Sequence, residues 1–157
     1  FDNLIVIKSI SKSFGVPGLR LGVLASNDVD LVEFIKKDVA IWNINSFAEF
    51  YLQIFEKYKS DYKDAMKDFY EVRKEFVTKL SMINNIRVVP SQANYLLCEV
   101  LNGYKATELT KILLDKYNIL IKDLSTKKGF DGEYIRVAVK RPEENDKLVE
   151  SIEKILC

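Results

Sequence analysis

The stretch Ser9-Ile-Ser-Lys-Ser-Phe-Gly-Val-Pro-Gly-Leu-Arg-Leu-Gly22 is the most informative part of this chain. It follows the apolar run Leu4-Ile-Val-Ile7 and places Lys12 just beyond that run. A lysine at this place can form a Schiff base with an aldehyde cofactor. Ser9 and Arg20 can hold a phosphate, one as a hydroxyl donor and the other as a planar, bidentate fork. The stretch therefore predicts a site for an aldehyde cofactor that carries a phosphate.

The pattern Ser-x-Ser-Lys-x-Phe-Gly-x-x-Gly-x-Arg-x-Gly resembles the lysine signature of fold-type I enzymes that depend on pyridoxal 5'-phosphate. It is most similar to class I/II aminotransferases, in the branch of histidinol-phosphate aminotransferases and threonine-phosphate decarboxylases. Later segments match this branch in order: Trp42-Asn-Ile-Asn45, Ser91-Gln-Ala-Asn-Tyr-Leu-Leu97, and Tyr134-Ile-Arg-Val-Ala-Val139 followed by Pro-Glu-Glu-Asn145. The resemblance implies a mixed α/β fold, in which this chain supplies the edge of the large-domain sheet and the small C-terminal α+β domain.

Composition and charge exclude several classes of function. Hydrophobic residues make up 48% of the 157 residues, which is enough for a buried core, and a net charge of +1 predicts no steering of nucleic acid. No stretch is long enough to span a membrane. The absence of histidine excludes a Cys/His zinc site and a Ser-His-Asp triad. Cys98 and Cys157 have no metal-type spacing, so we expect no metal and reduced thiols in a cytoplasmic protein, with a disulfide as the alternative.

We expect the chain to be the C-terminal piece of an enzyme. It begins without Met, immediately before a strand, and the resemblance covers only the second half of fold-type I enzymes. In those enzymes the preceding half normally supplies an aspartate for the pyridine nitrogen, an aromatic residue that stacks on the ring, and further phosphate ligands. The expected divisions are residues 1–58 as the end of the cofactor-binding large domain, 59–82 as an interdomain helix, and 83–157 as the small domain.

Hydrophobic periodicity and turn residues predict the elements. Strands are expected over Leu4–Ile7 (buried on both faces), Leu19–Ala25 after a type II turn at Pro17-Gly18, Ile86–Val89, Tyr95–Val100, Ile119–Ile121 and Tyr134–Val139. Helices are expected from an Asn27 cap to about Lys37, from the capping box Ser46-Phe-Ala-Glu49 to about Tyr58, over Asp61–Leu80, over Thr107–Tyr117 with Asn118 as the stop, and over Pro142–Leu156. The second half therefore reads as an α+β layer.

The resemblance implies roles for the residues of the lysine stretch. Lys12 would carry the Schiff base and, once a substrate amine has replaced it, would move a proton between the substrate Cα and C4′ of the cofactor. Ser9, Ser11 and Arg20 would bind the cofactor phosphate. A loop serine is often only a turn former, and this alternative stays open for Ser11.

Arg136, Asn45 and Asn94 are the expected substrate-binding residues. On the strand over Tyr134–Val139, Arg136 alternates with apolar neighbours and so points away from the core. The resemblance implies that it binds a substrate carboxylate, whereas the alternative is a solvated arginine on a half-exposed sheet. Asn45 has the alternative of only shaping the turn before a helix, and Asn94 that of ordering its loop.

The expected activity is that of a pyridoxal-phosphate-dependent aminotransferase, working as a homodimer on small molecules. It would transfer an amino group between an amino acid, or a phosphorylated amino compound, and a 2-oxo acid. One alternative is a decarboxylase of the threonine-phosphate type, which shares the lysine signature. Another is a non-catalytic module or an inactive fragment. Lys140 and Arg141 stand where the relatives often carry glycine and a small residue, which leaves the substrate open.

Overall fold

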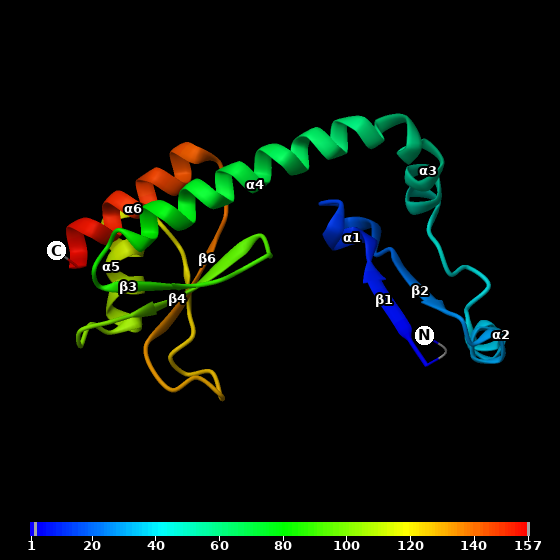
Figure 1. The fold of residues 1–157 in the computed structure, drawn as a ribbon, viewed down its shortest axis with the longest axis horizontal. Helices are drawn as coiled ribbons and strands as arrows, with labels where there is room; N and C mark the ends of the chain where they lie inside the picture. The colour runs from blue at the N-terminus through cyan, green and yellow to red at the C-terminus, as the bar shows by residue number, and fades with distance from the viewer. Residues whose placement is uncertain (2, 157) are drawn as a thin grey trace. The chain divides into compact units, whose positions relative to one another are not determined.

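The computed structural model describes residue 1 and residues 3–156. The chain divides into two compact units, Phe1–Ala65 and Met66–Cys157 (Figure 1). Each unit contains one antiparallel sheet together with helices. The chain therefore mixes α and β elements in both units, as the sequence predicts.

The first unit is built on a two-stranded sheet. In it, β1 (Ile5–Ser9) pairs antiparallel with β2 (Gly22–Ser26), so that Ser9 lies opposite Gly22. The helical elements are α1 (Ile10–Ser13), the 3-10 turn η1 (Pro17–Leu19), α2 (Val29–Asp38), α3 (Ser46–Phe55) and the 3-10 turn η2 (Glu56–Tyr58). All five residues of β1 are exposed in this chain, so the predicted burial on both faces is not found within it.

Turn and cap predictions in the first unit need correction. Pro17-Gly18 does not form a type II turn, which would require positive φ at the glycine, but begins a 3-10 turn for which the fixed φ of proline is suited. The N-cap of α2 is Asp28 rather than Asn27, and the N-cap of α3 is Asn45 rather than Ser46. In both helices the capping side chain belongs to the residue just before the first helical one, where its oxygen reaches a free backbone N–H.

The second unit is an antiparallel sheet with helices packed on it. The long helix α4 (Lys59–Ser81) begins in the first unit and ends in the second. The sheet has the order β3-β4-β6-β5, with β3 at Ile86–Val89, β4 at Tyr95–Val100, β5 at Lys122–Asp123 and β6 at Tyr134–Ala138. The remaining helices are α5 (Ala106–Tyr117) and α6 (Pro142–Leu156). The predicted bounds of β3, β4 and α6 are confirmed.

The main core of the molecule lies between one face of this sheet and the helices. In β6, Ile135 and Val137 are fully buried while Arg136 is exposed, which confirms the predicted alternation. The same buried cluster includes residues of all three helices of the unit, among them Phe76 of α4, Leu113 of α5 and Ile152 of α6. Burying one such side chain contributes about 1.5–3 kcal/mol, so this unit has the means to hold its fold.

The strand predicted over Ile119–Ile121 is wrong. Backbone pairing begins one residue later, where Lys122 lies opposite Arg136 in the ladder between β5 and β6. Ile121 is buried and Ile119 packs against the core, whereas Leu120 is exposed. The apolar run therefore reflects the burial of two of its three side chains rather than strand pairing. Asn118 ends α5 in the left-handed conformation (φ 54°), as predicted. None of the described helices combines the length and the hydropathy needed to cross a bilayer.

Candidate cofactor and substrate site

The lysine stretch forms a strand, one helical turn and a returning strand. Lys12 lies exposed in α1, directly after β1. The backbone N–H of Ser11 donates to the carbonyl oxygen of Leu21 at 3.0 Å, which continues the pairing of Ser9 with Gly22. The segment from Ser9 to Lys12 therefore runs beside the segment that carries Arg20, as a joint phosphate site requires.

The two serines of the stretch have different surroundings. Ser9 is exposed at the N-cap of α1, and its side chain makes no capping hydrogen bond, which leaves its hydroxyl open to a ligand. Ser11 is only 3% exposed, and its Oγ accepts from Leu21 N at 2.5 Å and donates to Leu21 O at 3.2 Å. Because a hydroxyl carries a single hydrogen, a phosphate contact by Ser11 would require the second of these bonds to break.

Arg20 ends the turn η1 in the left-handed conformation, with φ 53° and ψ 39°. Its side chain is exposed, and none of the ion pairs among the described residues involves it. A guanidinium without a carboxylate partner is suited to an anion such as a phosphate.

Asn45 has a structural role, which was the alternative to substrate binding. Its Oδ1 accepts from Ala48 N at 2.9 Å and so caps α3, while its Nδ2 donates to Leu19 O at 3.0 Å. It thereby ties the start of α3 to the residue before Arg20. Contact of Asn45 with a substrate stays a prediction.

Aromatic packing holds the lysine stretch against later helices. This packing was not predicted from the sequence. The ring of Phe14 lies 4.7 Å from that of Phe55 and 4.6 Å from that of Tyr62, measured between centroids. The Tyr62 hydroxyl also donates to Ser13 O at 2.9 Å. The position of Tyr62 at the start of the apolar stripe of α4 indicated that its side chain packs against other residues. An apolar stripe does not identify the segment that it contacts.

Arg136 and Asn94 belong to the second unit, and both are exposed. The Arg136 Cζ lies 5.2 Å from the centroid of the Tyr95 ring, and no ion pair among the described residues involves this arginine. Asn94 immediately precedes Tyr95, and its backbone oxygen accepts from Val139 N at 3.0 Å. Arg136 therefore contacts the Tyr95 ring, and Asn94 is the preceding residue on the backbone.

Arg73 of α4 supports this region and was not predicted. Its guanidinium donates to Ala93 O at 3.2 Å and to Gln92 Oε1 at 2.8 Å, and its Cζ lies 5.2 Å from the Tyr70 ring centroid. These contacts fix the loop that leads to Asn94. The spacing along α4 marked either Val72 or Arg73 as part of the apolar stripe, but an arginine on a stripe gave no sign of a loop contact.

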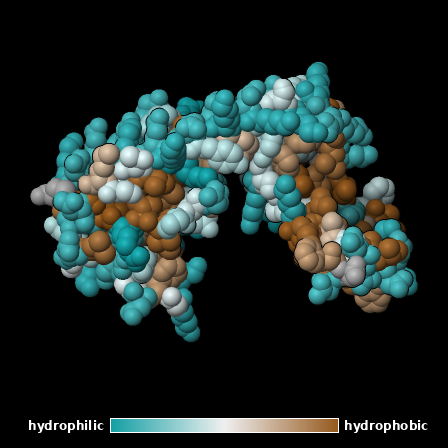
Figure 2. Space-filling model, viewed as in Figure 1, coloured by the Kyte–Doolittle hydropathy of each residue, from teal (hydrophilic) through white to brown (hydrophobic). Residues whose placement is uncertain are grey.

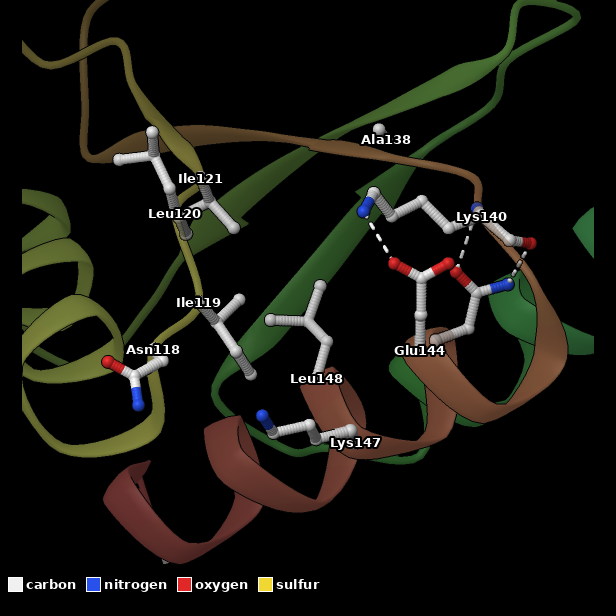
Figure 3. A pocket seen from close by; sticks show the side chains of 10 residues that line it. Asn118, Ile119, Leu120, Ile121, Ala138, Lys140, Glu144, Lys147 and Leu148 are labelled. Atoms are coloured by element: carbon white, nitrogen blue, oxygen red, sulfur yellow. Dashed lines mark hydrogen bonds and ion pairs between the residues drawn. The ribbon is translucent and has the colours of Figure 1, made fainter.

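The second unit also has a shallow groove beside α6 (Figure 3). Half of its lining residues are aliphatic and half are polar or charged, and the Lys140 Nζ pairs with Glu144 at 2.5 Å. The groove measures about 210 Å³, less than the roughly 300–1,000 Å³ of most small-molecule sites. Arg136 does not line it, so the groove is separate from the predicted substrate residues. Its lining residues are Asn118, Ile119, Leu120, Ile121, Ala138, Lys140, Glu144, Asn145, Lys147 and Leu148.

The chain belongs to the class I and II aminotransferase family, whose model matches residues 2–152. Enzymes of this family depend on pyridoxal phosphate. The chain is 34% identical to an L-serine phosphate decarboxylase of Campylobacter jejuni, over 97% of its own length and 39% of the relative. It is also 34% identical to a histidinol-phosphate aminotransferase of Caldanaerobacter subterraneus, over 99% of its length and 42% of the relative.

Among solved structures, a decarboxylase from Sulfurospirillum multivorans matches with a TM-score of 0.91 and 33% identity, over all of this chain and 45% of the other. The predicted fold, the C-terminal part of a fold-type I transferase, is thereby confirmed. The chain spans about two fifths of the length of the two curated relatives named above.

Proposed function

We propose that this chain is the C-terminal part of a pyridoxal-phosphate-dependent aminotransferase. The enzyme would transfer an amino group between an amino acid, or a phosphorylated amino compound, and a 2-oxo acid. The observation that carries the proposal is the set of exposed groups on the lysine stretch. The Lys12 amine, the Ser9 hydroxyl and the Arg20 guanidinium lie on adjacent backbone segments of a chain whose family uses this cofactor.

These groups fit the cofactor by their chemistry. Lys12 offers the amine that reacts with an aldehyde and can afterwards move a proton at the substrate Cα. The Ser9 hydroxyl would donate a hydrogen bond to the phosphate, and Arg20 offers a guanidinium free of ion pairs with the described residues. When bound, pyridoxal phosphate stores the electron pair that is released at the substrate Cα. Ser11, predicted as a further phosphate ligand, has its hydroxyl on Leu21, which favours a supporting role.

Arg136 is proposed to bind the substrate carboxylate. It is exposed, it has no ion pair among the described residues, and the Tyr95 ring restrains its guanidinium on one face. Such restraint lowers the entropy lost when a carboxylate is bound. Asn94 stays a proposed substrate contact beside it, and Asn45 a weaker one because its amide is already engaged.

A second candidate function is decarboxylation of a phosphorylated amino acid. The observation that favours it is the 34% identity to the L-serine phosphate decarboxylase, which equals the identity to the aminotransferase. The two reactions differ in the bond broken at Cα, and the lysine stretch serves both. By itself the chain, which corresponds to about two fifths of those enzymes, is proposed to be inactive.

The wider organisation is part of the same proposal. Residues 1–58 would end the large domain, 59–82 would form the interdomain helix, where α4 spans Lys59–Ser81, and 83–157 would form the small domain. We propose a cytoplasmic homodimer, for which the exposed apolar side chains Ile41, Trp42 and Phe47 of the first unit provide contact surface.

The experiment uses the whole protein that carries this chain. Borohydride treatment of the cofactor-loaded protein should fix the cofactor on Lys12, as read by peptide mapping. The cofactor bound to a lysine as a Schiff base is yellow. Lys12→Ala should remove this colour and lower turnover by several orders of magnitude. The matched variant Lys37→Ala, which changes an exposed lysine of α2, should behave as the wild type. Normal turnover of Lys12→Ala would refute the proposal.

The reaction is then decided by product analysis. Histidinol phosphate with a 2-oxo acid tests transamination by the appearance of the new amino acid. L-serine phosphate alone tests decarboxylation by release of carbon dioxide. Carbon dioxide without any transfer of the amino group would replace the first candidate by the second.

A further inference from the structure

We infer that Ser11 and Asn45 serve the cofactor site through Arg20, whose backbone they hold from both sides. The inference rests on the proposed function, because it takes Arg20 as a ligand of the cofactor phosphate. It makes both residues positioning residues, a role that differs from the ligand roles the sequence pattern suggested for them.

The backbone at Arg20 is unusual for its residue type. Three non-glycine residues among those described have positive φ, namely Arg20, Asn102 and Asn118. Asparagine tolerates the left-handed region, whereas arginine rarely adopts it. A long side chain held there requires surroundings that fix the backbone, and such positions concentrate at functional sites.

The residue before Arg20 is fixed by Asn45. The Asn45 Nδ2 donates to Leu19 O at 3.0 Å across 26 residues of sequence. The same side chain is anchored in turn by α3, because its Oδ1 accepts from Ala48 N at 2.9 Å, and Ala48 is only 1% exposed. The carbonyl of Leu19 therefore has a rigid partner.

The residue after Arg20 is fixed by Ser11. Leu21 N donates to Ser11 Oγ at 2.5 Å, and Leu21 O accepts from the hydroxyl of Ser11 at 3.2 Å and from its backbone N–H at 3.0 Å. Both residues are buried, at 3% and 7% exposure. Because Ser11 is the neighbour of Lys12, these bonds also tie the backbone that presents the amine to the backbone that presents the guanidinium.

Holding both flanks has a chemical consequence. A guanidinium on a fixed backbone loses little freedom when it binds a phosphate, so its contribution to affinity is larger. If either flank is released, Arg20 can relax to an ordinary backbone conformation and its fork turns away from the phosphate. Loss of the Asn45 or Ser11 side chain should then weaken cofactor binding only as long as Arg20 is present.

The test is a double-mutant comparison in the whole protein. Asn45→Ser keeps an oxygen that can cap α3 but is too short to reach Leu19 O. Arg20→Gly removes the guanidinium and adopts positive φ without cost. The readout is the dissociation constant of pyridoxine 5'-phosphate, which carries the phosphate but no aldehyde, measured by calorimetry. Asn43→Ser, on an exposed neighbour, is the matched control.

We expect Asn45→Ser to weaken binding roughly two- to tenfold, the range of a single lost hydrogen bond. In the Arg20→Gly background the same change should leave the dissociation constant unaltered, as should Asn43→Ser in the wild type. Ser11→Ala should follow the pattern of Asn45→Ser. If Ser11→Ala does not fold, the Asn45 pair alone decides the inference.

The outcomes separate the inference from the proposed function. Equal weakening by Asn45→Ser in both backgrounds, or no weakening in the wild type, overturns the inference and leaves the phosphate role of Arg20 intact. Unchanged affinity in Arg20→Gly itself overturns that role and the inference with it. Weakening by Asn45→Ser that occurs in the wild type but not in Arg20→Gly supports both the inference and the phosphate role of Arg20.

Discussion

At the scale of single residues, two exposed arginines are proposed to bind anions, Arg20 of the first unit and Arg136 of the second. Arg20 and Arg136 both lack an ion pair among the described residues, whereas Arg87 pairs with Glu99. An exposed arginine that already pairs with a carboxylate has less uncompensated charge and fewer free N–H donors for binding another anion. Arg141 is also exposed and without an ion pair among the described residues, so a free guanidinium alone does not single out an anion ligand. The place of Arg20 in the lysine stretch and the contact of Arg136 with the Tyr95 ring are the reasons why we propose the first for a phosphate and the second for a carboxylate.

Replacing Arg136 by lysine tests the fork rather than the charge. Arg136→Lys keeps a cation but loses the two parallel hydrogen bonds and the planar contact with Tyr95. We expect kcat/KM for carboxylate-bearing substrates to fall by roughly ten- to a hundredfold, corresponding to the 1.5–3 kcal/mol of a charge-assisted hydrogen bond. The measurement compares an amino acid with the amine that lacks its carboxylate. A similar loss on both substrates would show that Arg136 supports the fold instead.

At the scale of elements, the predictions succeeded where one strong pattern decided the structure. The alternation in Tyr134–Val139 gave both the strand and the direction of Arg136, and Pro142 marked the first turn of α6. They failed where the deciding partner is distant in sequence. The ladder of β5 is set by β6 rather than by the apolar run Ile119–Ile121, so periodicity could not place it.

The predictions for the candidate site also succeeded for local features and failed for contacts between distant segments. Its residue types could be inferred from the local pattern around Lys12. The bonds of Ser11 to Leu21 and of Asn45 to Leu19 could not, because each depends on how two segments pack. The same holds for the contact of Arg73 with the loop before Asn94.

Helix α5 shows such a long-range effect on stability. The residue at its N-cap, Lys105, makes no side-chain cap, and Glu133 supplies one by accepting from Ala106 N at 2.9 Å. This hydrogen bond lowers the pKa of the Glu133 carboxyl below its usual 4.5. A second hydrogen bond, from the Lys105 Nζ to the Glu133 Oε1 at 3.0 Å, acts in the same direction. A lowered pKa means that the folded state favours the charged carboxylate. Its stabilisation is therefore present above pH 4.5 and is lost as the pH falls through the folded-state pKa.

We expect Glu133→Ala to lower the free energy of unfolding by about 1 kcal/mol at pH 7, the usual value of a lost cap. The difference from the wild type should shrink as urea unfolding is repeated at successively lower pH below 4.5, because the wild-type carboxylate is then progressively protonated. Glu153→Ala, at an exposed position of α6, serves as the control and should leave stability unchanged. A difference that stays constant with pH would mean that packing, and not the charged cap, is lost.

At the scale of the whole molecule, the two units differ in how they bury apolar side chains. Every residue of the main buried cluster lies between Phe76 and Leu156, in the second unit. In the first unit the buried residues among those described are Ser11, Leu21 and Ala48. Large apolar side chains there stand exposed, among them Ile7 at 78% and Trp42 at 91%, and Figure 2 shows hydrophobic side chains gathered over this unit. The sequence predicted the longer helices and strands of both units, but not α1, the two 3-10 turns or β5, and not how much surface the first unit leaves uncovered.

Because its core is closed, the second unit should fold without the first. We expect residues 66–157 alone to unfold in one cooperative urea transition, followed by circular dichroism, while residues 1–65 alone should show no such transition and should associate through their apolar surface. Leu96→Ala sharpens the test, since Leu96 is fully buried in the core of the second unit. It should lower the free energy of unfolding by about 2–5 kcal/mol, and by the same amount in residues 66–157 and in the whole chain. A cost that differs between the two would show that the core of the second unit depends on the first.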